Sequence, residues 1–233
     1  MLLLLPPSEG KTAPSARRST VDLAALSFAE TLGPLRGRLI EAVDPALASA
    51  PTAPAAEVYS GVLYARLDHG SLPAAAKRRA RANVLVASGL WGMTGLADRI
   101  PAYKLPIDAR VDGLGTLAAA WRPLVAQALA SHDRRGELVV DCRSGGYAAV
   151  WRPAHAPRVE VRAFKLKPGG SRQVISHMAK DTRGRVAREL LLAARAPRRP
   201  ADVLAIVLSA GLDAELAETP GRDDAWTLDV LER

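Results

Sequence analysis

The chain has 233 residues, and 48% of them are hydrophobic, which is enough to bury the core of one large domain or of two small ones. Lys and Arg total 32 against 24 Asp and Glu, so the net charge of +8 indicates an anionic partner, although an arginine- and alanine-rich composition that reflects a GC-rich genome gives the same excess. Cys142 is the single cysteine, which excludes an intrachain disulfide and a cysteine-based zinc site and is typical of a reducing compartment.

An apolar run at the start of the chain, Leu2–Leu5, predicts a short strand that is buried on both faces. Pro6 and Pro7 end this run after too few residues for a signal peptide, and no basic segment precedes it. Apolar runs elsewhere are far shorter than the roughly 18 residues that cross a bilayer. We therefore expect a cytoplasmic protein without a membrane partner.

The middle of the chain alternates helical and apolar segments. Leucines predict a broken helix across residues 21–43, and residues 44–56, rich in Ala and Pro, predict a linker-like loop. Val84–Ala87 and Leu138–Val140 are apolar enough for buried strands. Between these strands an amphipathic helix is predicted by the spacing of Leu117, Trp121, Leu124, Val125 and Ala128.

A hairpin and a helix are predicted in the next part of the chain. Residues 159–164 alternate as a half-exposed strand does, and residues 172–176 are expected to pair with it across a turn at Pro168–Gly170. A helix is expected over residues 177–194.

The last segments complete the prediction of the fold. Residues 203–208 are not assigned by periodicity, but Pro200 and Asp202 favour the start of a helix there. Residues 226–231 can return as a final strand. Strands interleaved with helices predict a mixed α/β fold, a single domain over residues 1–233 whose β-sheet core is flanked by helices.

The first segment with possible chemistry is Leu5–Thr12, which ends in Gly-Lys-Thr like a phosphate-binding loop. Leu5 stands where that loop has its first glycine, and the two prolines lack the N–H groups that cradle phosphate, so an NTPase is disfavoured. Ser8, Lys11 and Thr12 are still predicted to contact a ligand, because α/β folds place ligand sites at the carboxyl ends of strands. A plain turn with an exposed lysine is the alternative.

A glycine-rich segment follows the second predicted strand. Gly89, Gly92 and Gly95 resemble the turn of a helix-hairpin-helix, which presents backbone N–H groups to DNA phosphates. Two residues separate Gly92 from Gly95, and this spacing departs from that motif. A glycine-rich turn that packs Trp91 and Leu96 into the core explains the segment as well.

The third predicted strand is followed by Ser144 and Tyr147, which are placed to hydrogen-bond a ligand, and by Arg143, which is placed to pair with an anion. A glycine turn with a half-buried tyrosine is the alternative. Cys142 carries no signature of a nucleophile, and we expect a buried, inert thiol.

The predicted helix over residues 177–194 carries a basic face. Lys180, Arg183 and Arg188 fall on neighbouring turns, opposite an apolar face that includes Val186 and Leu190. This pattern predicts a helix that faces phosphates, although a solvated charged face gives the same pattern. The four histidines do not show metal-ligand spacing, so we predict neither a metal site nor a cofactor.

Taken in this order, the segments resemble the YaaA-like peroxide-stress family. The resemblance spans nearly the whole chain and is carried by Pro6–Thr12, Tyr59–Tyr64, Ser88–Gly92, Asp98, Ile100, Tyr103–Leu105, Ser144, Tyr147, Ala179–Lys180 and Arg183–Gly184. Two pairs, Glu9-Gly10 and Gly145-Gly146, depart from the residues that are usual in the family.

The resemblance implies a cytoplasmic protein that helps cells survive peroxide and limits iron-dependent oxidative damage. It implies non-sequence-specific binding of double-stranded DNA in a basic cleft, with a helix-hairpin-helix-like element. According to the resemblance, the residues that contact DNA or another anion are Lys11, Lys104, Lys180, Arg183 and Arg188. The pocket-lining set is Ser8, Thr12, Ser144 and Tyr147. Separately, the oligomeric state is not predicted by the sequence, with a monomer favoured.

Two functions of different classes remain open at this point. The leading hypothesis is DNA binding during oxidative stress. The alternative is an enzyme that acts on a small anionic or nucleotide-like substrate in the same cleft. The sequence names no general base or nucleophile, so the reaction and its catalytic residues are not predicted. Direct sequestration of iron requires clustered His and carboxylate ligands, which the sequence does not show.

Overall fold

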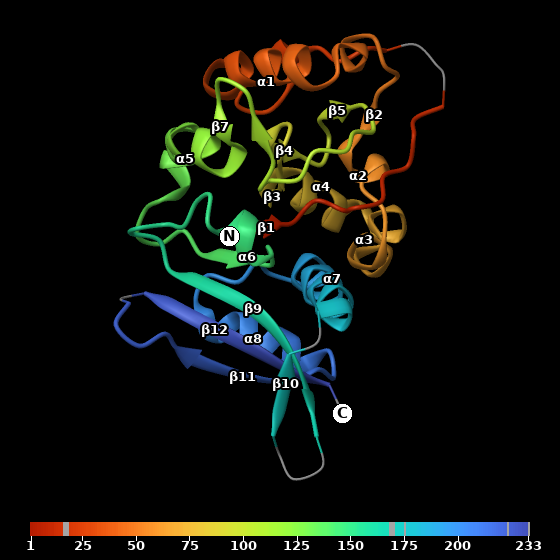
Figure 1. Ribbon diagram of the computed structural model, residues 1–233. Helices are drawn as coiled ribbons and strands as arrows, with labels where there is room; N and C mark the ends of the chain where they lie inside the picture. The colour runs from red at the N-terminus through yellow and green to blue at the C-terminus, as the bar shows by residue number, and fades with distance from the viewer. Residues whose placement is uncertain (16–18, 168–170, 175, 223, 233) are drawn as a thin grey trace.

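A mixed eight-stranded sheet forms the centre of the molecule (Figure 1). The computed structural model describes residues 1–15, 19–167, 171–174, 176–222 and 224–232. The strands lie in the order β11-β12-β9-β8-β1-β3-β4, and β10 pairs with β9 outside this path. Their bounds are β1 (Leu2–Leu5), β3 (Val84–Ser88), β4 (Gly92–Gly95), β8 (Val139–Asp141), β9 (Arg158–Leu166), β10 (Arg172–Val174), β11 (Asp213–Glu218) and β12 (Ala225–Glu232). The predicted mixed α/β fold is confirmed.

The first strand, β1, lies in the middle of the sheet because its leucines are apolar on both faces. Leu3 to Leu5 are fully buried, and β1 runs parallel to β3 on one side and to β8 on the other. A parallel strand with two buried faces is what a continuous apolar run specifies. The strands predicted at residues 2–5, 84–87 and 138–140 are therefore confirmed, within a residue at their ends.

Helices cover this sheet, with α1 and α5 near its β4 end and α7 and α8 near β9 and β12 (Figure 1). The predicted amphipathic helix is confirmed as α5, whose Leu117, Trp121 and Val125 are fully buried. The long helix α7 packs against α3, α4, α8 and β9. The bounds are α1 (Ala29–Val43), α2 (Ala55–Val58), α3 (Val62–Leu67), α4 (Ala74–Asn83), α5 (Leu117–Ala128), α6 (Gly145–Ala148), α7 (Ser176–Leu192) and α8 (Pro200–Ser209).

Shorter elements occupy the connections. The 3-10 helices are η1 (Leu23–Ala25), η2 (Pro45–Ala48), η3 (His69–Ser71) and η4 (Ala130–His132), and the two-residue strands are β2 (Ala53–Pro54), β5 (Arg99–Ile100), β6 (Arg110–Val111) and β7 (Gly115–Thr116). The prediction of a linker-like loop over residues 44–56 is wrong, because η2, β2 and the start of α2 lie there. The Asp44 carboxylate accepts the Ala46 N–H and so caps η2.

The C-terminal predictions agree with the structure. β10 pairs with β9 as expected, while the predicted turn at residues 168–170 lies outside the described residues. The unassigned segment at residues 203–208 belongs to α8, where the Asp202 carboxylate accepts the N–H groups of Arg198 and Arg199. The predicted last strand is β12. In the part of the chain that the structure describes, no helix is both long and apolar enough to cross a membrane.

The glycine-rich segment after β3 differs from its prediction. β3 and β4 form an antiparallel hairpin in which Ser88 lies opposite Gly92, so the helix-hairpin-helix prediction for Gly89, Gly92 and Gly95 is wrong. Gly92 has φ +69° and faces the Trp121 ring, and a Cβ at Gly89 would collide with the Leu105 carbonyl oxygen. These glycines therefore allow close packing in the core. Two short helices, α2 and α3, lie at residues 55–67.

Candidate functional site at the carboxyl edge of the sheet

The connections that follow β1 and β8 leave the sheet in opposite directions. β1 leads to the side of β3, whereas β8 leads to β9 on the other side. Open α/β sheets bind ligands at such a topological switch point, outside the carboxyl ends of the strands. We call the residues gathered at this edge the carboxyl-edge site: Ser8, Glu9, Lys11, Tyr59, Tyr64, Tyr103, Tyr147 and Lys180.

Lys11 lies at the centre of this site. Its backbone forms a bridge with Tyr59, and its Nζ donates a hydrogen bond to the Ser8 carbonyl oxygen at 2.7 Å. The same Nζ lies 4.3 Å from the ring centroid of Tyr103. Burial lowers the pKa of Lys11 to about 8, although the Glu9 charge opposes this shift. Lys11 is therefore a half-buried amine on an aromatic surface.

All four tyrosines of the chain belong to this site. Tyr59 stacks on Tyr64 with ring centroids 5.4 Å apart, and the Tyr64 hydroxyl donates to the Pro6 carbonyl oxygen at 2.7 Å. Burial raises the pKa of Tyr147 to about 12; a hydrogen bond with the Ile107 backbone opposes this shift, and the charges of Tyr59, Asp108 and Glu9 contribute to it. Tyr147 is therefore a neutral phenol at physiological pH, and as a half-buried side chain it can donate a hydrogen bond to a ligand.

A chain of hydroxyl groups fixes the tyrosines beneath Lys11. Ser88 Oγ accepts the N–H groups of Leu90 at 3.1 Å and Trp91 at 2.9 Å, which occupies both of its lone pairs. Its proton is therefore directed to the Tyr103 hydroxyl, 2.6 Å away, and the Tyr103 proton to the Tyr59 hydroxyl, 3.0 Å away. These two hydrogen bonds hold the Tyr103 ring in place.

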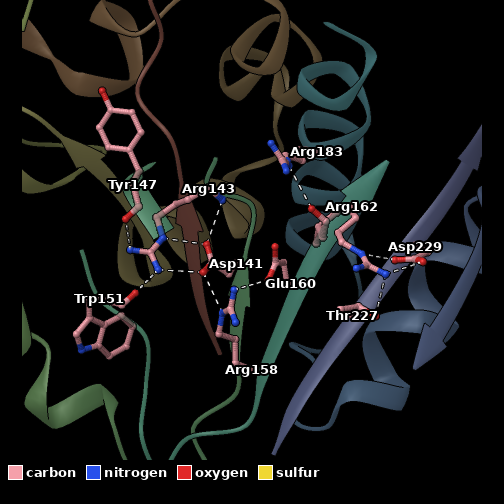
Figure 2. Close-up of polar contacts among 11 residues, drawn as sticks. Asp141, Arg143, Tyr147, Trp151, Arg158, Glu160, Arg162, Arg183, Thr227 and Asp229 are labelled. Carbon is pink, nitrogen blue, oxygen red and sulfur yellow. Dashed lines mark hydrogen bonds and ion pairs between the residues drawn. The ribbon is translucent and has the colours of Figure 1, made fainter. Parts of the chain in front are cut away.

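A buried ion-pair network supports the segment that follows β8 (Figure 2). Both carboxylate oxygens of Asp141 accept from Arg143 at 2.9 Å, and one of them also accepts from Arg158 at 3.0 Å. Arg143 donates in addition to the carbonyl oxygens of Tyr147 and Trp151. The Tyr147 side chain points away from this network in Figure 2. The network thus fixes the backbone that carries Tyr147.

This network corrects one expectation about the segment. Arg143 was placed to pair with a ligand anion, but it is only 2% exposed and its guanidinium is bonded to Asp141 and to backbone carbonyls. Asp141 is fully buried between two arginines. Cys142 is buried as expected, and burial raises the pKa of its thiol to about 12.

The structure also excludes a phosphate-binding loop after β1. Such a loop opens directly into a helix at its Lys-Thr pair. Here Lys11 forms a bridge to Tyr59, and the first helix described after it is η1 at Leu23–Ala25. Ser8 instead stabilises its own loop, because its Oγ donates to the Gly10 carbonyl oxygen and accepts the Ser60 N–H. Thr12 and Ser144 are exposed.

The predicted basic residues divide into two groups. Lys180 reaches the site, where its Nζ lies 2.7 Å from the Glu9 carboxylate, and Lys104 is exposed next to Tyr103 in the chain. Arg183 donates to the Val161 carbonyl oxygen at 3.1 Å (Figure 2). Arg188 donates to the carbonyl oxygens of Leu67 and Asp68, at the end of α3. Arg183 and Arg188 thus connect α7 to its neighbours.

Comparisons with known proteins place this geometry in a family. A family model described as "Peroxide stress protein YaaA" matches residues 35–206. The chain is 38% identical to a UPF0246 protein of Streptomyces coelicolor, over 99% of this chain and 98% of the relative. It is 35% identical to a UPF0246 protein of Corynebacterium efficiens, over 99% of this chain and 100% of the relative. The chain belongs to the YaaA peroxide-stress family. The resemblance drawn from the sequence is confirmed.

In this YaaA-family chain the sequence did not assign four residues of the site, namely Glu9, Tyr59, Tyr64 and Tyr103. Tyr59 and Tyr103 were visible only as part of the family resemblance, because a tyrosine between apolar segments usually indicates core packing. Their shared feature is that, with Tyr64 and Tyr147, they are all the tyrosines of the chain. Among the described residues, no group of three or more His, Cys, Asp or Glu is placed to hold a metal ion.

Proposed function

We propose that this YaaA-family protein acts in the response to peroxide stress as an enzyme on a small anionic, nucleotide-like substrate bound at the carboxyl-edge site. One observation carries the proposal: Lys11, with a pKa of about 8, lies against the rings of Tyr59 and Tyr103 at a topological switch point. Ligand sites combine a largely apolar, aromatic lining with a few polar groups, and perturbed pKa values gather in them.

The tyrosines and the lysines of the site suit the base and the phosphate of a nucleotide, respectively. Aromatic faces stack on nucleobases, and the half-buried Tyr147 offers such a face together with a hydroxyl donor. Lysine ammonium groups bind phosphate; Lys180 of α7 lies at Glu9, and Lys104 is exposed next to Tyr103 in the chain. Arg183 and Arg188 are left out of this assignment because they bond to backbone carbonyls.

Calorimetric titration with AMP, ATP and inorganic phosphate tests this proposal. We expect millimolar or tighter binding of a nucleotide, weakened roughly tenfold or more in the Lys104→Ala/Lys180→Ala double variant because charge-assisted contacts are lost. The matched control is Lys165→Ala, which removes an exposed lysine from β9 and should leave affinity unchanged. Absence of nucleotide binding, or an equal loss in the Lys165→Ala protein, would contradict the proposal.

Non-sequence-specific binding of double-stranded DNA is a second candidate, favoured by the net charge of +8. In this proposal Lys11, Lys104 and Lys180 contact backbone phosphates, and bound DNA is shielded from iron-dependent oxidative damage. Three phosphate contacts predict an affinity that falls ~40-fold between about 50 and about 200 mM salt, because counterions are released.

Fluorescence anisotropy with a labelled duplex at the two salt concentrations provides the test. Lys104→Ala/Lys180→Ala should weaken binding to all sequences equally and make the salt dependence less steep. Charge reversal at Arg183 or Arg188 is a poor test, because it removes contacts that connect α7 to β9 and α3. A duplex affinity that is absent or independent of salt contradicts DNA binding.

A further inference from the structure

Lys11 differs from the other described lysines in what surrounds its amine. Lys180 faces the Glu9 carboxylate, and Lys77 donates to the Gly70 carbonyl oxygen on the surface. The remaining lysines, Lys104, Lys165 and Lys167, are exposed. Lys11 Nζ is half-buried, and no carboxylate of the described chain lies within ion-pair distance of it. Its surroundings are the Ser8 carbonyl oxygen and the rings of Tyr59 and Tyr103.

These contacts leave the nitrogen lone pair of the neutral amine free. A neutral lysine has two N–H bonds and one lone pair. One N–H is directed to the Ser8 carbonyl oxygen, 2.7 Å away, and this bond fixes the nitrogen without using the lone pair. A carboxylate partner would hold the amine protonated instead. The geometry is therefore that of a positioned amine nucleophile.

We propose that the Lys11 amine is the nucleophile of the carboxyl-edge site and forms an imine with the aldehyde carbon of a phosphate-bearing substrate. The phosphate part of this statement rests on the proposed function. The nitrogen lone pair adds to the carbonyl carbon, and the former carbonyl oxygen takes a proton to give a carbinolamine. That hydroxyl leaves as water while the C=N bond forms, so amine and aldehyde give imine and one water.

The amine is available for this step at physiological pH. With a pKa of about 8, roughly a tenth of Lys11 is neutral at pH 7, compared with well under a thousandth for a lysine of ordinary pKa. The titratable groups that face Lys11 are Glu9 on its own loop and the phenols of Tyr59 and Tyr103, with Lys180 of α7 beyond Glu9. Both phenols are buried, and burial raises their pKa values, so they stay neutral across this range.

Reductive trapping with glycolaldehyde phosphate tests the proposal. Borohydride delivers hydride to the imine carbon, water protonates the nitrogen, and the stable secondary amine is mapped by peptide mass spectrometry. We expect Lys11 to be labelled at least about tenfold faster than the exposed Lys165 at pH 7, with a rate midpoint near pH 8. Lys11→Arg should remove this fast labelling, whereas Lys165→Arg should leave it intact.

Two further measurements separate this inference from the proposed function. If Lys11 is labelled no faster than Lys165, or its rate midpoint lies near pH 10, the nucleophile proposal is overturned whatever the nucleotide titrations show. If glycolaldehyde without phosphate labels Lys11 as fast as glycolaldehyde phosphate does, the nucleophile stands and the phosphate recognition fails. Tyr103→Phe keeps the ring beside Lys11 and should preserve the midpoint near pH 8.

Discussion

At the level of single residues, several arginines of this basic chain are buried and stabilise its own backbone. Arg36 is fully buried and donates to the carbonyl oxygens of Ser27, Trp91 and Met93. Arg143 bonds to two carbonyl oxygens as well as to Asp141. A net charge therefore overstates how much of the basic surface is available to an anion.

Asp141 gives the clearest prediction at this scale. Burial raises the pKa of its carboxyl, but the charge and hydrogen bonds of Arg143 and the charge of Arg158 more than offset this, so the pKa lies below its usual value. Replacing it in Asp141→Asn leaves two buried guanidinium groups without their full counter-charge. We expect the free energy of unfolding at pH 7 to fall by roughly 3–5 kcal/mol, measured by urea denaturation.

The pH dependence of this loss has a definite sign. Because the folded-state pKa of Asp141 is lowered, its stabilising contribution is complete above the unfolded-state value near ~3.9 and disappears as pH falls through the folded value. The difference between wild type and Asp141→Asn should therefore shrink below about pH 4. Glu41→Gln, an exposed carboxylate of α1, should change little at any pH. A difference that stays constant in acid would contradict this account.

At the level of elements, α3 and α7 approach closely because Gly184 has no side chain. A Cβ at Gly184 would collide with the Leu63 carbonyl oxygen and lie 2.7 Å from Cβ of Arg66. Gly184→Ala should therefore destabilise the protein by roughly 1–3 kcal/mol, although alanine is the better helix former. Gly37→Ala in α1 meets only Leu23, at 3.8 Å, and should stabilise by up to about 1 kcal/mol. Thermal unfolding of both variants checks these opposite signs.

The elements that could be predicted from the sequence are those in which one local signal dominates. Apolar runs indicated β1, β3 and β8, and helical spacing indicated α5 and α7. The strand β4 (Gly92–Gly95) was missed because two glycines hide its strand character, and β11 (Asp213–Glu218) because Ala and Glu favour helices. Their pairing with β3 and β12 decides their conformation, and that pairing is a tertiary property.

At the level of the whole molecule, the candidate site could be predicted in part. Ser8, Lys11 and Tyr147 were recognisable because each follows a predicted strand, and the carboxyl ends of parallel strands meet at one edge. In the sequence pattern, Arg183 and Arg188 are as typical of anion-binding residues as Lys180 is. Their hydrogen bonds to Val161, Leu67 and Asp68 depend on how α7 is packed, which no local pattern in the sequence records.

The contact between Glu9 and Lys180 joins two segments that lie 171 residues apart in the sequence. Lys180 Nζ lies 2.7 Å from the Glu9 carboxylate, and this hydrogen bond, together with the Lys180 charge, lowers the pKa of Glu9. Glu9 therefore competes with an incoming phosphate for Lys180 and places a negative charge beside Lys11. Glu9→Gln should tighten the binding of inorganic phosphate roughly two- to fivefold in about 20 mM salt.

The gain should largely disappear in about 300 mM salt, because both groups are exposed and screened. Calorimetric titrations of wild type and variant at the two salt concentrations measure this. Glu218→Gln on β11 raises the net charge by the same amount at a strand on the edge of the sheet, so it separates a local effect from a general one. Equal gains in the two variants would mean that phosphate responds to total charge, and that the Glu9–Lys180 pair does not control access to the site.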